Sequence, residues 1–312
     1  MNSVIYVKGV SHTFLVKDPT RFRGFIEVKA LQNIDLEIEE NKITSIVGES
    51  GSGKTTLANI ILGFLKPTKG DIIWKGNSIF SNQTKREYIK HIYFIPQNPA
   101  NSLNPRMNIK SIISEPLLFR TKLSKKEIDK EVRRVINEVN LSEEVLKKYP
   151  HELSGGEKQR VSIARSIIAK PSIIVLDEPV SSLDVSVRAQ ILNLLKELKE
   201  SHNLTYIYIS HDIATTRFIS DNLIILLKGR IMEIAPSEEI FQNPKNPYTQ
   251  FLIYSVPKQS IIKNFEIKNR EEDSTGCPFY NKCPIASEIC KEEFPKPKNI
   301  SETHIVYCHN IC

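Results

Sequence analysis

The sequence predicts an α/β fold, in which short buried strands alternate with helices. The first observation is a strand-like run over residues 43–47 that leads straight into a glycine-rich turn and a predicted helix over 54–65. The second is a set of short runs rich in Ile, Leu and Val, each bounded by turn or charged residues: 92–95, 173–176, 204–209 and 223–227. Such strands suit a sheet that is covered on both faces.

Two helices are predicted from apolar residues that recur at helical spacing. The first stripe consists of Ile128, Val132, Val135, Ile136 and Val139, and the second of Val187, Ile191, Leu194, Leu195 and Leu198. Lys, Arg and Glu fill the opposite face of the first helix. We interpret this stripe as core packing rather than as a ligand site.

The length and composition predict one main domain with an appendage. The chain has 312 residues, of which 40% are hydrophobic and 25% charged, as in an ordinary globular protein. After Ile234 the regular pattern weakens and prolines break up the chain. We therefore predict a main domain over residues 1–235 and a small irregular extension over 236–312.

No apolar run approaches the roughly 20 residues that cross a bilayer. The N-terminus lacks the basic start and long apolar centre of a secretory signal, so we expect the chain to stay in the cytoplasm and to reach a membrane only through partners. The formal net charge of +7 comes from 43 basic and 36 acidic residues without a dense basic block. We interpret this charge as a solvated basic face.

A motif of the form G-x-x-x-x-G-K-[ST] follows the strand at 43–47 and opens the helix at 54–65. In such a loop, backbone N–H groups and the helix N-terminus surround phosphate oxygens. We expect Lys54 to reach the β- and γ-phosphates of a nucleotide and the Thr55 hydroxyl to bind Mg²⁺. The predicted nucleotide-binding residues are Gly48, Glu49, Ser50, Gly51, Ser52, Gly53, Lys54, Thr55 and Thr56.

An acidic pair ends the apolar strand at 173–176. Asp177 would hold Mg²⁺, directly or through water, and Glu178 would orient and deprotonate the attacking water. Acidic residues often simply cap a strand, but together with the phosphate loop this pair predicts nucleotide hydrolysis.

The segment Leu153-Ser154-Gly155-Gly156-Glu157 resembles the signature of the ABC ATPases, LSGGQ or a close variant, with Glu157 in place of Gln. Ser154 and the glycines can present a hydroxyl and N–H groups at a helix N-terminus to a γ-phosphate. In the family they contact the nucleotide held by a partner subunit, so the resemblance implies a dimer with each ATP between two chains. It also implies a P-loop NTPase (RecA-like) core with a mixed sheet and a helical subdomain inserted over about 98–165.

Three further residues match family elements in order and spacing. Gln97 resembles the Q-loop glutamine, which senses Mg²⁺ and the attacking water. Asp184, in Ser182-Leu183-Asp184, resembles the D-loop at the dimer interface. His211 resembles the switch histidine that contacts the γ-phosphate. The resemblance therefore assigns catalytic roles to Glu178, Gln97 and His211.

The family also places an adenine-stacking aromatic residue upstream of the phosphate loop. Phe14 is our choice, with Phe22 and Phe25 as alternatives. No Asn-Lys-x-Asp element for reading guanine appears. The implied cofactors are ATP and Mg²⁺.

Motifs outside the core resemble those of the oligopeptide/dipeptide import ATPases, and specifically of the F-type member of their heterodimeric pair. They are Asn98-Pro99, Ser102–Met107, Tyr149–Glu152, Glu178–Ser181 and Asn246–Thr249. The implied partners are a second ABC ATPase subunit, homologous or identical, two transmembrane permeases and, through the complex, an extracytoplasmic substrate-binding protein. The implied location is the cytoplasmic face of the cell membrane.

Two alternative functions stay open. Related ATPases serve nickel and metallophore importers, and no residue in this chain reads the transported substrate. A non-transport ABC ATPase is the other alternative, but repair and chromosome versions insert long coiled coils before the signature, and translation-associated versions carry two cassettes. This chain has neither feature, so we expect no nucleic-acid partner.

All five cysteines follow residue 276, and four of them give the pattern C-x5-C-x6-C-x17-C. Cys277, Cys283, Cys290 and Cys308 would suit a [4Fe–4S] cluster, and the pattern resembles the C-terminal extension of this ATPase family, in which such clusters occur. Zinc and no metal are the alternatives, although the pattern lacks the short C-x2–4-C spacing of many zinc sites. Cys312 is interpreted as a spare thiol.

Overall fold

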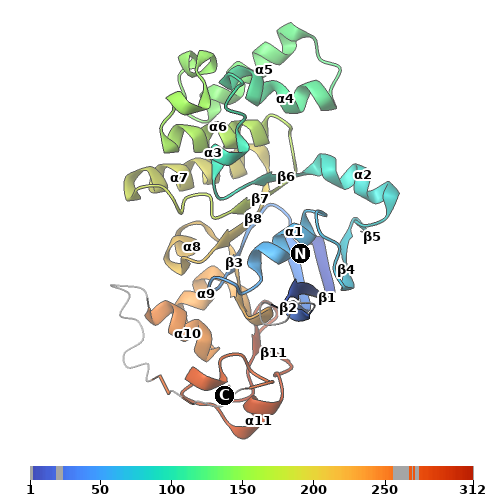
Figure 1. Ribbon diagram of the computed structural model, residues 1–312. Coiled ribbons are helices and arrows are strands. Elements are labelled where there is room, and N and C mark those ends of the chain that lie inside the picture. The colour runs from blue at the N-terminus through green and yellow to red at the C-terminus, as the bar shows by residue number, and fades with distance from the viewer. Residues whose placement is uncertain (1–2, 19–23, 256–266, 269, 271–273, 312) are drawn as a thin grey trace. The chain divides into compact units, whose positions relative to one another are not determined.

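The computed structural model describes residues 3–18, 24–255, 267–268, 270 and 274–311. The chain forms two compact units, one made of Met1–Lys85 with Tyr208–Cys312 and the other of Arg86–Ile207 (Figure 1). The boundaries fall within α2 (Asn82–His91) and β8 (Thr205–Ser210). The predicted phosphate loop lies in the first unit, and the predicted acidic pair lies in the second.

The first unit contains a four-stranded sheet with the order β2-β1-β4-β5 and a second set of strands with the order β11-β12-β10-β9-β3. Their bounds are β1 Ser3–Lys17, β2 Phe25–Glu39, β3 Ile43–Val47, β4 Lys69–Trp74, β5 Asn77–Ser78, β9 Asn222–Leu227, β10 Arg230–Pro236, β11 Pro297–Asn299 and β12 Ile305–Tyr307. The second set is mixed, because β3 runs parallel to β9 while the other pairs are antiparallel. The predicted mixed sheet is therefore confirmed.

The helices of this unit are short. They are α1 Lys54–Ile61, α8 Ile213–Ile219, α9 Ser237–Gln242, α10 Pro247–Tyr254 and α11 Glu288–Glu292, with a 3₁₀ turn η3 at Tyr280–Lys282. The sequence placed the end of the first helix at residue 65, which is wrong by one turn. Gly63 adopts a φ of 71°, a left-handed conformation that ends helices, and its N–H donates to Ile60 O.

The second unit combines two strands with a group of helices (Figure 1). Its elements are β6 Ile92–Ile95, α3 Pro99–Ser102, α4 Ile109–Arg120, α5 Lys125–Glu138, η1 Glu143–Lys147, η2 Pro150–Glu152, α6 Gly155–Ile167, β7 Ile173–Asp177 and α7 Val185–His202. The strands β6 and β7 pair in parallel, with Ile95 opposite Leu176. Their carboxyl ends therefore meet at one edge, which positions the residues that follow them.

The amphipathic stripes predicted for α5 and α7 are confirmed as core. Val132, Val135 and Ile136 on α5 are fully buried, and so are Ile191 and Leu195 on α7. A capping box starts α5, because the Ser124 hydroxyl accepts from Glu127 N and the Glu127 carboxylate accepts from Ser124 N.

The C-terminal segment shares a hydrophobic core with the strand that leads into the phosphate loop. Val47 of β3 belongs to the same buried cluster as Tyr248 of α10, Phe279 and Cys283. The Tyr248 and Phe279 rings lie 5.3 Å apart, centroid to centroid. The segment is therefore packed into the first unit rather than joined to it only through a linker.

A buried group of charged residues fastens β12 to the rest of the first unit. His304 and Glu233 are both fully buried, and the two ring nitrogens of His304 lie 2.7 Å from Glu233 Oε1 and 2.7 Å from Glu239 Oε1. Because each nitrogen faces a carboxylate, both carry protons and the ring is an imidazolium. Burial opposes this charge, but the hydrogen bonds to the two carboxylates outweigh burial and raise the pKa of His304. We call these three residues the His304 clasp.

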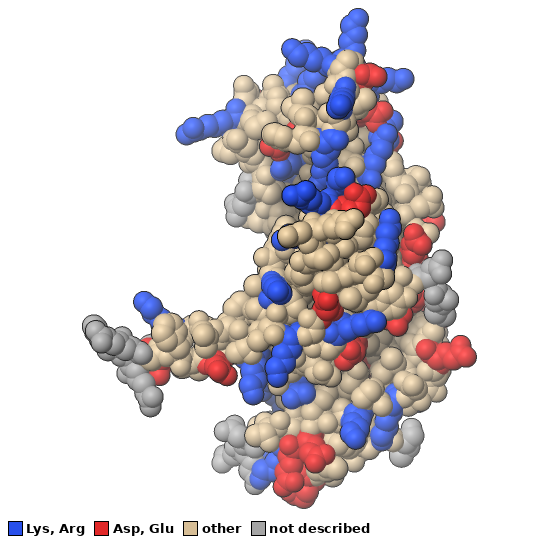
Figure 2. All heavy atoms as spheres, turned by 90° about the vertical axis from the view of Figure 1, so that its right-hand side faces the viewer, with Lys and Arg blue, Asp and Glu red and all other residues tan. Residues whose placement is uncertain are grey.

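No helix in the described ranges is long and apolar enough to cross a membrane. On the face shown in Figure 2, basic side chains are interspersed with acidic and uncharged ones. This distribution agrees with the solvated basic face expected from the sequence.

Candidate functional site

The phosphate loop joins β3 to α1, as the sequence predicts. Two glycines are required by close backbone approach: a Cβ on Gly48 would lie 2.0 Å from Leu226 O, and one on Gly53 would lie 2.5 Å from Ala30 O. Gly53 also has a φ of 101°, which other residues rarely adopt. The N-terminus of α1 has no side-chain cap, so its first N–H groups remain available to phosphate oxygens.

Lys54 holds the loop in shape from inside. Its side chain is 7% exposed, and Nζ donates to Gly48 O and Glu49 O at 2.8 Å each, with Ser52 Oγ at 3.4 Å. These are neutral acceptors, and phosphate oxygens would make stronger, charge-assisted hydrogen bonds with the same ammonium. The Lys54 ammonium therefore already lies inside the loop in which a phosphate would bind.

The acidic pair ends β7 in the second unit. Asp177 is 9% exposed, and Glu178 turns the chain with a φ of 46°. Gln97, which follows β6, donates from Nε2 to Glu178 Oε2 at 2.8 Å. The parallel pairing of β6 and β7 thus brings together two residues that the sequence assigned to catalysis. A left-handed φ on a non-glycine residue is uncommon and is often found at functional sites.

The signature segment forms the N-terminus of α6. Ser154 is the N-cap: its Oγ accepts from Glu157 N at 3.3 Å, while Glu157 Oε2 accepts from Ser154 N and Ser154 Oγ at 2.8 Å each. The hydrogen bond from Ser154 N, together with that from its hydroxyl, lowers the pKa of Glu157. The glutamate that departs from the usual Gln therefore completes a capping box, a function that the sequence analysis did not assign to it.

The second glycine of the signature lies close to α7. A Cβ on Gly156 would meet Val187 Cγ1 at 2.7 Å. Asp184 is the N-cap of α7 and accepts from Val187 N at 3.0 Å and from Ser186 Oγ at 2.9 Å. The hydrogen bond from Val187 N is the main cause that lowers the pKa of Asp184. In this structure Asp184 starts a helix, and its D-loop role stays a prediction.

His211 follows the end of β8 and is exposed, in the same unit as the phosphate loop. The next residue, Asp212, caps α8 by accepting from Ala214 N at 3.0 Å and Thr215 N at 3.3 Å. This cap fixes the turn that carries His211. Its contact with a γ-phosphate remains a prediction.

The adenine-stacking residue also remains a prediction. Phe14 lies on β1 opposite Val28, is 37% exposed, and packs edge-on against His12 with centroids 4.5 Å apart. Phe25 is 64% exposed on β2, whereas Phe22 lies outside the described residues. The exposed Phe14 and Phe25 are both accessible to a base.

Four free thiols line one small cavity in the C-terminal segment: Cys277, Cys283, Cys290 and Cys308. Burial, together with the neighbouring thiols, raises the pKa of Cys277 to about 12 and that of Cys283 to about 11. Within the described residues, no group of three or more His, Cys, Asp or Glu side chains is arranged to hold a metal ion. The structure therefore does not support the iron–sulfur or zinc prediction, and Cys312 lies outside its described part.

The comparisons with known proteins agree with the motifs. Residues 31–181 match the ABC transporter family, and residues 232–290 match "Oligopeptide/dipeptide transporter, C-terminal region". The chain is 37% identical to the oligopeptide transport ATP-binding protein AppF of Bacillus subtilis, over 98% of this chain and 97% of that protein. It is 39% identical to the dipeptide transport ATP-binding protein DppF of Haemophilus influenzae, over 91% and 90% of the two chains.

Solved structures confirm the predicted fold class. CbiO1 of Clostridium perfringens, part of the ABC transporter complex cbiONQ, aligns with a TM-score of 0.69 and 26% identity over 83% of this chain and 97% of that chain. The ATP-binding cassette MJ0796, a dimer bound to ADP and Pi, aligns with a TM-score of 0.66 and 30% identity over 75% and 98%. The chain therefore belongs to the ABC transporter family, as one of its ATP-hydrolysing subunits.

Proposed function

We propose that this ATPase energises the import of oligopeptides or dipeptides through two membrane permeases. The hydrogen bond between Gln97 and Glu178, at the carboxyl edge of β6 and β7, is the observation that carries the hydrolytic role. The peptide assignment is supported by relatives named as peptide transport proteins that match nearly the whole chain. No such observation favours a nickel or metallophore importer.

In the proposed reaction, the triphosphate lies in the loop around Lys54, whose ammonium exchanges its carbonyl partners for phosphate oxygens. By the sequence motifs, Thr55, Asp177 and Gln97 would provide oxygen ligands of the kind that Mg²⁺ prefers, and the ion would neutralise charge on the phosphates. Glu178 accepts the proton of the attacking water while Gln97 orients its carboxylate. His211 contacts the γ-phosphate.

We propose that a second ATPase subunit, identical or homologous, completes each nucleotide site with Ser154. The dimeric structure of the neighbour MJ0796 supports the pairing of two subunits. In the free chain the Ser154 hydroxyl donates to Glu157, so this bond must be exchanged for one to phosphate when the dimer closes. The other proposed partners are an extracytoplasmic substrate-binding protein within the complex and the permeases, which place this chain at the cytoplasmic face of the cell membrane.

Deletion of the gene for this protein in its source organism is expected to abolish growth when a dipeptide is the only source of a required amino acid. Growth on the free amino acid should persist, because its uptake does not need this motor. The wild-type gene should restore growth, whereas a Lys54→Ala gene should not. Normal dipeptide growth together with a loss of nickel-enzyme activity would instead assign the chain to metal import.

We also propose a [4Fe–4S] cluster at Cys277, Cys283, Cys290 and Cys308. The proposal rests on the sequence pattern of these four cysteines, whose thiols line one cavity. Such a cluster is bound through one thiolate per iron, so its ligands need not converge on a single ion. The raised pKa values of Cys277 and Cys283 mean that metal binding would have to displace their protons.

Protein purified without oxygen is expected to absorb near 400 nm and to contain about four irons per chain, if the four thiols bind a cluster. Cys283→Ser should lose both signals, whereas Cys312→Ser should keep them. Iron and absorbance are measured on the same samples. A colourless, iron-free wild-type preparation would reject the cluster. If that preparation contained one zinc per chain, the four cysteines would be assigned to a zinc site instead.

A further inference from the structure

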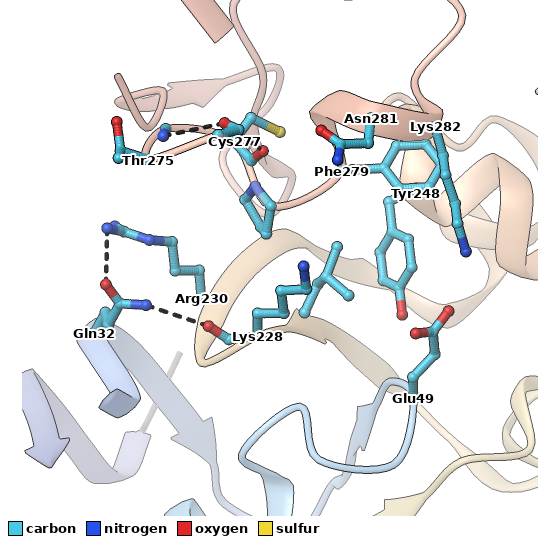
Figure 3. A pocket seen from close by; sticks show the side chains of 14 residues that line it. Gln32, Glu49, Lys228, Arg230, Tyr248, Thr275, Cys277, Phe279, Asn281 and Lys282 are labelled. Carbon is cyan, nitrogen blue, oxygen red and sulfur yellow. Dashed lines mark hydrogen bonds between the residues drawn. The ribbon is translucent and has the colours of Figure 1, made fainter. Parts of the chain in front are cut away.

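A second cavity lies within the first unit, between the phosphate loop and the cysteine segment, and none of the proposed hydrolytic steps uses it. Its volume is about 330 Å³, within the range of small-molecule sites. It is lined by Glu49 of the phosphate loop, by Lys228 after β9, by Arg230 at the start of β10, by Tyr248 of α10 and by residues 274–279, 281 and 282 (Figure 3).

One end of the cavity presents a fixed positive charge. Arg230 donates from Nη2 to Gln32 Oε1 at 3.0 Å, Gln32 donates from Nε2 to Lys228 O at 3.3 Å, and the guanidinium lies 4.3 Å from the centroid of the Phe294 ring. Burial lowers the pKa of Arg230, and within the described ranges its guanidinium is not paired with a carboxylate. The Lys228 side chain extends away from Arg230, toward the middle of the cavity (Figure 3). The end is thus prepared for an anionic group that the chain itself does not provide.

The other end presents acceptors. Figure 3 shows the Tyr248 hydroxyl next to the Glu49 carboxylate, away from Gln32 and Arg230. Tyr248 is 1% exposed, and its buried hydroxyl lies against Glu49 without a well-formed hydrogen bond. Burial, and then the charge of Glu49, raises the pKa of Tyr248, so the phenol stays neutral. Lys282 lies on this side too, but its ammonium extends over the Phe251 ring, 5.9 Å from the centroid.

We propose that this cavity binds a small zwitterion, an amino acid or a short peptide with free termini. The carboxylate would bind Arg230, and the ammonium would bind Glu49 and the Tyr248 hydroxyl. Opposite charges at the two ends select a ligand with opposite charges at its own ends, whereas a simple anion would meet the Glu49 carboxylate unpaired.

The site adjoins the nucleotide-binding machinery through Glu49. The backbone oxygen of this residue accepts from Lys54 Nζ at 2.8 Å, while its side chain lines the cavity. A ligand held by the carboxylate therefore acts on the same residue that shapes the phosphate loop. If the ligand regulates the ATPase, it would do so as a molecule of the same class as the imported product. That role rests on the proposed peptide import. The binding itself does not depend on that assignment.

Calorimetric titration of the full chain with dialanine, in the presence of a saturating non-hydrolysable ATP analogue, tests the proposal. We expect saturable binding that is at least tenfold weaker for N-acetyl-dialanine amide, which lacks both charges. Arg230→Gln should weaken dialanine binding at least tenfold, and Lys66→Gln, a change of an exposed lysine outside the cavity, should leave it unchanged. Nucleotide affinity measured on each variant verifies that it is folded.

Equal binding of free and blocked dialanine, or unchanged binding by Arg230→Gln, would overturn the proposal. The proposal would also be overturned if pyrophosphate bound, if Arg230→Gln abolished that binding, and if dialanine did not bind at all. The cavity would then be a site for simple anions. If Arg230→Gln fails to fold, Tyr248→Phe decides: it removes only the hydroxyl and should weaken dialanine severalfold. Dipeptide-dependent growth is scored separately, so failure of the binding proposal leaves the transport proposal intact.

Discussion

Glu178→Gln is expected to lower ATP turnover by about 10²–10⁴-fold while ATP still binds. The amide has the shape of the carboxylate and can keep the hydrogen bond from Gln97 Nε2, which lies 2.8 Å from Glu178 Oε2 in the wild-type chain. The amide cannot take a proton from water. Because ATP would persist, the two-subunit complex should also persist. Turnover is measured by phosphate release, and association by size-exclusion chromatography with and without ATP.

The matched control is Glu144→Gln, a change of an exposed glutamate in the same unit. It should leave both turnover and association unchanged. A Glu178→Gln protein that hydrolyses ATP at the wild-type rate would remove Glu178 from its assigned role. Loss of ATP binding in that variant would instead show that Glu178 positions the nucleotide.

His304→Ala is expected to destabilise the first unit by about 3–5 kcal/mol, since it leaves a buried carboxylate without its cation. Glu233 would keep only its hydrogen bonds from Lys245 N (2.8 Å) and Asn246 N (3.1 Å). Urea unfolding, followed by fluorescence near neutral pH, measures the change. His309→Ala, which removes a surface hydrogen bond to Glu293 O, is the control and should cost far less.

The clasp also sets a pH dependence. The pKa of His304 is raised in the folded chain above its ordinary value of 6.5, so the folded state binds the proton more tightly than the unfolded state. The contribution of His304 to the free energy of unfolding is therefore complete below about pH 6.5. It is lost as the pH rises through the higher pKa of His304 in the folded chain. His304→Ala should lack this part of the pH profile. A wild-type stability that rises with pH over the same range would contradict the imidazolium assignment.

The sequence was most informative where one local pattern decides the structure. The bounds predicted for β3 and β6 are those observed, because each strand is a short run with clear turn or charged residues at its ends. The end of α1 was wrong because Gly63, not the apolar pattern, decides where the helix stops. The capping role of Glu157 could have been read from Ser154 and the three-residue spacing, which is a known helix-start signal.

Long-range contacts were the part that the sequence did not predict. His304 and Glu233 are 71 residues apart, and no periodic pattern marks either as a partner of the other. The same holds for Tyr248 and Glu49, which come from separate motifs and meet at one cavity. Gln97 and Glu178 were each assigned to catalysis through the family resemblance, but their hydrogen bond was not predicted. It follows from the parallel pairing of β6 and β7, whose carboxyl ends lie at the same edge.

The buried cluster that joins Val47 to Tyr248, Phe279 and Cys283 limits how this protein can be engineered. Cutting the chain after β10 would leave part of the apolar surface behind the phosphate loop open to water. Exchanging tails between related motors would therefore require matched changes on β3 and β9. The C-terminal segment after β10 cannot be exchanged as an independent module.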